Sequence, residues 1–207
     1  MSILVLTSDT LIGTPAAGNI EYSSPIFTGT PIGTQRGIVP TQQYYRLDSA
    51  VVGSNATGAQ STFGVGVTLS ASTVYEFEMV VAFSKSAGTT SHTFGLGFGG
   101  TATLNNIAYE EIHISSGTSF GTAEQTAVGS FQQSASNAVV TGASTSAFRS
   151  YVFILKGTVS INAGGTFIPQ YTLSAAPGGA YTTAAGSFIR IAPIGASGSA
   201  TNVGTWS

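Results

Sequence analysis

The fold is decided in the stretch Thr73-Val74-Tyr75-Glu76-Phe77-Glu78-Met79-Val80-Val81-Ala82-Phe83. Large apolar side chains recur at every second position from Tyr75 to Phe83, and Glu76 and Glu78 fall between them. Successive side chains of a strand point to opposite faces of its sheet. The pattern therefore predicts a half-buried β-strand whose two carboxylates lie on the solvated face.

A second stretch alternates in a different way. From His92 to Gly99, the large residues Phe94, Leu96 and Phe98 alternate with glycines. One face of such a strand carries large side chains and the other carries none. We therefore expect another segment to pack closely against the bare face.

Other segments of the chain share these period-two patterns and are separated by clusters of turn-forming residues such as Pro177-Gly178-Gly179. No window of a dozen residues has the apolar stripe and caps of a helix. About nine strands predict an all-β fold, a β-sandwich of jelly-roll type over residues 42–207. The further strand candidates are Tyr44–Val51, Phe63–Leu69, Ile107–Ile114, Glu124–Phe131, Phe148–Ser160, Thr166–Leu173 and Ser187–Ile194.

Residues 1–41 have no sustained period. Glycine or proline interrupts this region every few residues from Gly13 to Pro40. Because proline removes a backbone donor and glycine weakens regular elements, we predict an extended N-terminal arm. It would hold one short hairpin at most, with strands at residues 18–22 and 25–27.

Composition excludes several classes of protein. Charged residues make up 7% of the 207 positions, and the six Lys and Arg residues are spread from Arg36 to Arg190, so no nucleic-acid surface is expected. The chain has no cysteine and hence no disulfide, thiolate nucleophile or zinc–thiolate site.

The first nine residues do not form a secretory signal. The longest later apolar run, Tyr151–Leu155, is too short to cross a bilayer, so we expect synthesis in a cytoplasm and no membrane insertion.

One segment matches a nucleotide-binding pattern. Gly95-Leu96-Gly97-Phe98-Gly99-Gly100 satisfies G-x-G-x-x-G, whose glycines must link a strand to a helix that holds the pyrophosphate. Here the glycines lie inside a strand pattern, and residues 101–106 begin no amphipathic helix. We interpret them as glycines that allow close sheet or subunit contact, and no cofactor is predicted.

The histidines and the sequon lead to no predicted site. Nucleophilic catalysis needs a hydroxyl, a histidine and an orienting carboxylate, but no G-x-S-x-G elbow occurs. His92 is expected at the edge of a loop and His113 on the solvated face of a strand. The sequence Asn55-Ala56-Thr57 is a glycosylation sequon in a loop, and we predict that it is not used.

The acidic residues give no catalytic or metal site either. Glu76 and Glu78 would lie about 7 Å apart on one strand face, a spacing that suits a retaining glycosidase but equally any solvated strand. Glu110 and Glu111 are adjacent, so they point to opposite faces and cannot clamp one metal unless the strand is bulged. The sequence thus predicts a protein that is not an enzyme, with no catalytic residue, metal or cofactor and with unknown ligand-binding residues.

Assembly is favoured by the surface. Ser, Thr and Gly fill about two positions in five, and the net charge is −2, so long-range repulsion will not keep copies apart. Uncovered sheet edges are liabilities that subunit packing removes. We therefore expect a homo-oligomer.

Several short motifs resemble one family. They are Leu6-Thr7-Ser8, residues 14–22 (TPAAGNIEY), residues 35–43 (QRGIVPTQQ), residues 74–78, residues 94–102, residues 157–159, residues 169–171 and residues 186–191. Together they resemble a module of tailed-bacteriophage structural proteins, in which a hairpin is followed by a strand that begins with an Arg-Gly-x-x-Pro pattern. The resemblance implies a homotrimeric β-structure in a virion, often the head of a tail fibre that contacts the host surface.

The functional expectation follows from this resemblance. The chain begins only a few residues before the module, so we expect a short tail fibre or adhesin that contacts the host or docks on the tail. A capsid decoration protein that stabilises the head is the alternative, and a carbohydrate-binding module is a further one. Expected partners are copies of itself, other virion proteins of tail or capsid, and a host surface glycan.

Overall fold

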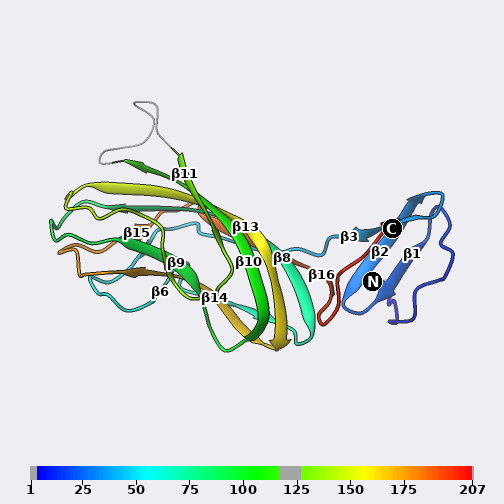
Figure 1. The fold of residues 1–207 in the computed structure, drawn as a ribbon. Helices are drawn as coiled ribbons and strands as arrows, with labels where there is room; N and C mark the ends of the chain where they lie inside the picture. The colour runs from blue at the N-terminus through cyan, green and yellow to red at the C-terminus, as the bar shows by residue number, and fades with distance from the viewer. Residues whose placement is uncertain (1–3, 117–126, 207) are drawn as a thin grey trace.

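The protein is all-β. The computed structural model describes residues 4–116 and 127–206, and this part of the chain contains no helix. Two antiparallel sheets face each other in a sandwich, and a third, smaller sheet near the N-terminus stands at one end of it (Figure 1). The β-sandwich expected from the sequence is present, while its jelly-roll connectivity stays a prediction.

The large sheet is built around β8 (Thr73–Lys85) and β13 (Arg149–Ala163), which pair over almost their whole length. On the far side of β13 lie β10 (Thr103–Ser116) and then β11 (Ala127–Gln132). The free edge of β8 is shared by two strands, each extended by one more. These are β16 (Phe188–Ala196) with β4 (Gln43–Arg46), and β15 (Thr182–Thr183) with β5 (Val51–Val52).

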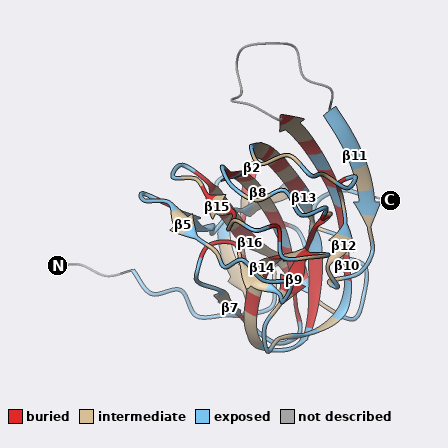
Figure 2. Cartoon of the chain, turned by 90° about the vertical axis from the view of Figure 1, so that its left-hand side faces the viewer, coloured by how far each residue is buried: buried red, intermediate tan, exposed pale blue. Residues whose placement is uncertain are grey.

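The small sheet covers one face of the large one. At its centre β9 (Phe94–Gly99) pairs with β14 (Gly165–Leu173). Its outer members are β12 (Ala138–Val139), β6 (Gln60–Ser61) and β7 (Val67–Leu69). Buried residues gather between the two sheets, whereas β5 and β11 at the edges are more exposed (Figure 2).

The alternation that predicts β8 is confirmed. All five large residues from Tyr75 to Phe83 are buried, Glu76 is exposed and Glu78 is half-buried. At the centre of the core, the fully buried ring of Phe94 stacks on Phe153 and Tyr171, with centroid separations of 5.4 and 5.1 Å. Such aromatic clusters dominate the stabilisation of a small core.

The bare face of β9 is covered, as its glycines predict. A Cβ added to Gly97 would lie 2.7 Å from the carbonyl oxygen of Ala135, so only glycine lets residues 135–138 approach this closely. The amide of Phe98 donates to the same carbonyl at 2.8 Å. The G-x-G-x-x-G match therefore belongs to the packing of a strand.

Some predicted strands are shorter or broken. The expected strand Tyr44–Val51 divides into β4 and β5, because Leu47 turns into the core and donates its amide to the carbonyl of Ser187. Of Phe63–Leu69 only residues 67–69 form a strand, since Gly64 adopts a positive φ of 73°. The strand expected from Glu124 begins at Ala127, and residues 124–126 lie outside the described residues.

Residues 20–39 form a three-stranded sheet rather than the single short hairpin expected in an extended arm. Its strands are β1 (Ile20–Ser23), β2 (Ile26–Ile32) and β3 (Gln35–Val39). Pro31 falls within a shift of register between Gly29 and Ile32, where no regular ladder bond is required. Gly33, at φ 54°, lies in the turn that follows β2. The prolines and glycines that argued against strands thus mark bends and turns of this sheet.

Candidate functional site

The most buried titratable groups form a pair on β10. Nδ1 of His113 lies 2.8 Å from Oε1 of Glu111, and both side chains are almost fully buried. The expectation of His113 on the solvated face is wrong. Tyr109, Glu111 and His113 share the inward face, so Ile112 and Ile114 point outward. As predicted, the adjacent Glu110 and Glu111 take opposite faces, with Glu110 exposed.

Hydrogen bonds extend this pair toward β11. Oγ of Ser130 donates to Oε2 of Glu111 at 3.1 Å and accepts a hydrogen bond from Gln132. Burial raises the pKa of Glu111, while His113 and Ser130 oppose the rise by stabilising the carboxylate. Burial, together with the nearby Glu111 charge, raises the pKa of Tyr109 to about 12. Gln132, Ser130, Glu111 and His113 thus form one hydrogen-bonded chain that ends at the buried pair.

His92 lies at the edge of a loop just before β9, as expected, and its side chain is buried. Its Nδ1 lies 2.8 Å from the carbonyl oxygen of Thr90, and its Nε2 lies 2.8 Å from the hydroxyl of Tyr181. Since a carbonyl only accepts, Nδ1 carries the proton and Nε2 accepts from the tyrosine. His92 therefore has a structural environment, with backbone bonds to Ser144 in both directions.

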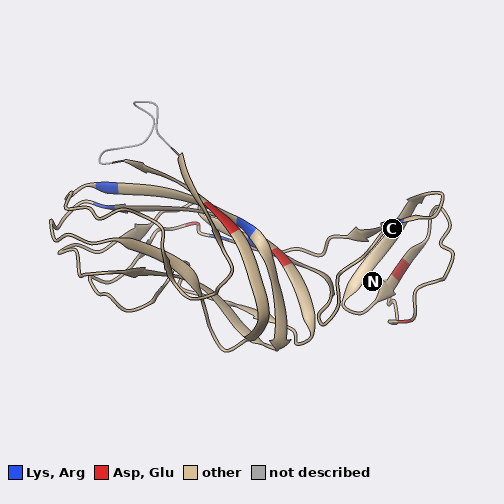
Figure 3. Ribbon diagram, in the orientation of Figure 1, with Lys and Arg blue, Asp and Glu red and all other residues tan. Residues whose placement is uncertain are grey.

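Glu76 and Glu78 lie on the outer face of the large sheet, as predicted. Arg190 on β16 donates to Oε2 of Glu78, and Lys156 faces Glu78 from β13. These residues surround a shallow hollow of about 340 Å³. Acidic and basic positions alternate across the strands there (Figure 3). No group of three or more potential metal ligands occurs within residues 4–116 and 127–206.

Lys85, at the end of β8, is a buried cation that the sequence did not single out. Its Nζ donates to four backbone carbonyls, those of Ala87, Gly88, Ser146 and Ala147, at 2.5–3.2 Å. Burial, helped by Arg149, lowers the pKa of Lys85, and the four carbonyl oxygens stabilise the charged form against that. The ammonium group thus ties two loops to one end of the sandwich.

An apolar groove opens at the side of the sandwich between β4 and β7. Its volume is about 360 Å³, within the range of small-ligand sites. Tyr44 and Tyr45 of β4 are 57% and 40% exposed, and Tyr45 meets the ring of Phe63 edge-on. Gln43 and Thr68 add polar groups at the rim. The sequence signal for this groove is the adjacent pair Tyr44-Tyr45, which follows Gln42-Gln43.

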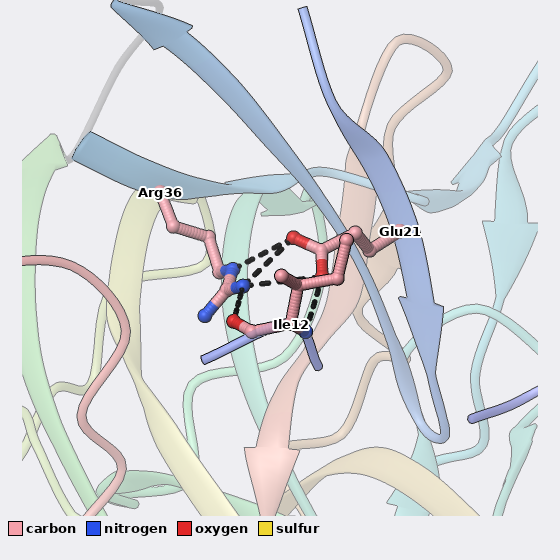
Figure 4. Close-up of polar contacts among 3 residues, drawn as sticks. All are labelled: Ile12, Glu21 and Arg36. Carbon is pink, nitrogen blue, oxygen red and sulfur yellow. Dashed lines mark hydrogen bonds and ion pairs between the residues drawn. The ribbon is translucent and has the colours of Figure 1, made fainter. Parts of the chain in front are cut away.

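A polar cluster holds the N-terminal sheet to the segment before it. Nε and Nη2 of Arg36 donate to the carboxylate of Glu21 at 2.9 and 3.1 Å, and Nη2 also donates to the carbonyl of Ile12 (Figure 4). The Ile12 amide donates to Oε1 of Glu21 at 2.8 Å. This backbone bond, followed by Arg36, lowers the pKa of Glu21. A Cβ on Gly204 would lie 3.5 Å from the Arg36 carbonyl, so the C-terminal residues lie alongside.

The sequon and the search for membrane spans add two observations. Asn55 is exposed, and its Oδ1 accepts the amide of Gly178 at 2.9 Å. Among the described residues, no helix is long and apolar enough to cross a membrane.

Comparison with known proteins identifies no family for this chain. No protein-family model matches the sequence, and no curated protein matches it. A solved structure described as "Structure of infectious bursal disease virus Gx strain" aligns with 84% of this chain at 11% identity. The TM-score is 0.21, and the chain spans 46% of that protein. A likeness this weak carries no argument about this chain.

Proposed function

We propose that this chain is a non-enzymatic structural protein of a bacteriophage virion, a short tail-fibre or adhesin component. One observation carries the proposal. Two of the stretches that resemble the phage module, residues 14–22 and 35–43, contribute to β1 and β3 of the N-terminal sheet, which stands apart from the sandwich (Figure 1), and residues 202–204 lie beside this sheet. The N-terminal sheet would attach to a neighbouring virion protein, and the sandwich would be presented outward.

The groove beside β4 supports contact with a host surface. Exposed aromatic rings next to amide and hydroxyl groups suit the flat, weakly polar faces of a sugar, and the lining residues of this groove carry no charge. We infer a surface glycan as its ligand class. The same groove would serve the alternative of a carbohydrate-binding module.

A specific observation favours a second candidate, a capsid decoration protein. Leu4 and Val5 are 84% and 77% exposed, and the segment that carries them extends away from the sandwich (Figure 2). Exposed apolar residues on an extended segment suit a contact with a neighbouring capsid subunit. In that role the sandwich would bridge subunits of the head.

Immunogold labelling of intact virions tests the proposal. Antibody raised against this chain should place gold at the tail end of the particle. Gold scattered over the head would overturn the tail-fibre role in favour of decoration. Particles without gold would overturn the virion role altogether.

A binding assay tests the groove independently. The purified protein should bind host cells and reduce infection, and Tyr45→Ala should lose most of the binding. Phe148→Ala is the matched control, because Phe148 is 61% exposed and is not part of the groove. Equal loss from both variants, or from neither, would contradict a role for the groove.

A further inference from the structure

The outer face of the large sheet carries an ordered row of charges. The register places Glu110, Lys156, Glu78 and Arg190 side by side on β10, β13, β8 and β16. The signs alternate from one strand to the next. In a chain with only fourteen charged side chains, four of them lie in this one row.

Aromatic residues continue the row at both ends. Phe131 on β11 is opposite Glu110, and Tyr44 on β4 is opposite Arg190. Phe131 is 65% exposed and Tyr44 is 57% exposed. The full row therefore runs aromatic, negative, positive, negative, positive, aromatic.

The next two rows on the same face are mainly apolar. They contain Ile112, Ile154, Val80 and Phe188 in one row, which ends at Arg46 on β4, and Ile114, Val152 and Ala82 in the other. All of these side chains are partly or fully accessible to solvent. Charged strand faces keep a sheet solvated, whereas contiguous apolar residues mark an interaction surface.

From this arrangement we propose that the outer face of the large sheet packs against the same face of a second copy, about a two-fold axis that runs along the strands between β13 and β8. Such an axis reverses the order of every row. Glu110 then faces Arg190 of the second copy, and Lys156 faces its Glu78. The apolar residues of the next two rows then face each other, Arg46 faces Gly129, and Phe131 faces Tyr44. A two-fold axis along the row would instead set like charges against each other, so the sign pattern selects the first geometry.

The size of the face fits a stable contact. From about 4.8 Å between strands and about 6.8 Å between alternate residues of a strand, the five rows that pass through positions 106, 108, 110, 112 and 114 of β10 cover on the order of 800 Å² across up to six strands. A standard interface buries about this much on each partner. Aligned packing of two sheets face to face is also a common arrangement in sandwiches. The inference rests on the register and charges of this sheet and not on the proposed function.

The mass in solution is the first test. Light scattering should give about 42 kDa at high protein concentration, twice the 20.9 kDa of the chain. The family resemblance predicts three copies, so a mass of about 63 kDa would overturn the two-fold pair. A mass near 21 kDa at every concentration would overturn it as well.

Charge reversal tests the geometry. Lys156→Glu sets two acidic groups against each other twice in each pair, and it should weaken association roughly tenfold or more. Adding Glu78→Lys to Lys156→Glu makes every swapped charge face its opposite again and should restore association. Thr68→Glu, on an exposed position of the small sheet, is the control and should not change the mass. Association unaffected by Lys156→Glu would contradict the proposal.

Cross-linking gives a readout that does not depend on charge. The chain has no cysteine, so Ile154→Cys introduces one thiol next to the axis, about 10 Å from its counterpart across packed sheets. A short bis-maleimide should convert this variant to a dimer of about 42 kDa. Val139→Cys, on the exposed β12, should stay monomeric on the gel. Equal cross-linking of the two variants would overturn the assignment of the face.

Discussion

Two regions of this chain are built from the same kinds of residue but are held together differently. In the sandwich, two sheets enclose one continuous core of apolar and aromatic side chains. In the N-terminal sheet only Ile26, Thr28 and Thr30 of β2 are buried. The hydroxyls of Thr28 and Thr30 have no hydrogen-bond partner among the described residues. A three-stranded sheet with so small a core depends on what covers it.

Polar contacts with residues 9–18 supply that cover. The amide of Asp9 donates to the carbonyl of Tyr22, and the amide of Gly18 donates to the carbonyl of Thr30. The Glu21–Arg36 pair adds a charged contact that reaches Ile12. We infer that the N-terminal sheet opens at a lower free energy than the sandwich, as units with few apolar contacts do.

The largest expected effect breaks the sandwich itself. Phe94→Ala should reduce the free energy of unfolding by about 4 kcal/mol, because it leaves a cavity among Phe83, Phe153 and Tyr171. Urea unfolding followed by circular dichroism measures it. Phe148→Ala, at an exposed position just before β13, should change the value by less than about 0.5 kcal/mol. Similar losses from both would show that the aromatic cluster does not dominate the core.

A smaller loss is expected at the loop end of the sandwich. Lys85→Met should lower the free energy of unfolding by about 2 kcal/mol. The reason is that four backbone carbonyls in two loops lose the charged hydrogen-bond donor that joins them. The same unfolding experiment measures it. Arg46→Met removes an exposed ion pair with Asp48 and should be nearly neutral. If Lys85→Met were neutral too, the lysine would not hold the loops.

An effect confined to the N-terminal sheet is expected from Arg36→Met. Amide hydrogen exchange should become several-fold faster in residues 9–39, since the variant loses the contacts to Glu21 and Ile12. Exchange in β8 and β13 should not change. Faster exchange throughout the sandwich would contradict the separation of the two regions.

The smallest effects are opposite responses to pH. Burial raises the pKa of Glu111 above 4.5, so its contribution to stability is complete below pH 4.5 and is lost as the pH rises through the raised pKa. The pKa of Glu21 is lowered, so its contribution is present above pH 4.5 and is lost as the pH falls through the lowered pKa. Acid should therefore stabilise the sandwich at Glu111 and loosen the N-terminal sheet at Glu21.

Two glutamine variants separate these responses. Glu111→Gln should remove the fall in sandwich stability as the pH rises above 4.5, measured by urea unfolding at several pH values. Glu21→Gln should remove the acid-induced rise in exchange over residues 9–39. Responses of the same sign in the two regions would contradict the assignment.

Local patterns predicted the strands at the centre of the sandwich. The alternation in β8 and the glycines of β9 depend only on which face each side chain takes, and this is fixed by the strand period. At one end of β10 the sequence pattern predicts the wrong inward face. Ile112 and Ile114 look like core residues beside His113, but Tyr109 and Glu111 set the phase, and the isoleucines point outward.

The sequence by itself determined an all-β chain, the inward face of β8 and the close approach to β9, because each depends on neighbours along one strand. Only the tertiary structure decided which residues lie side by side across strands. It brings together the row from Glu110 to Arg190, the groove beside Tyr45 and the four carbonyls around Lys85. The physical reason is that sheet register and loop contacts join residues far apart in the chain, and no local pattern encodes those pairings.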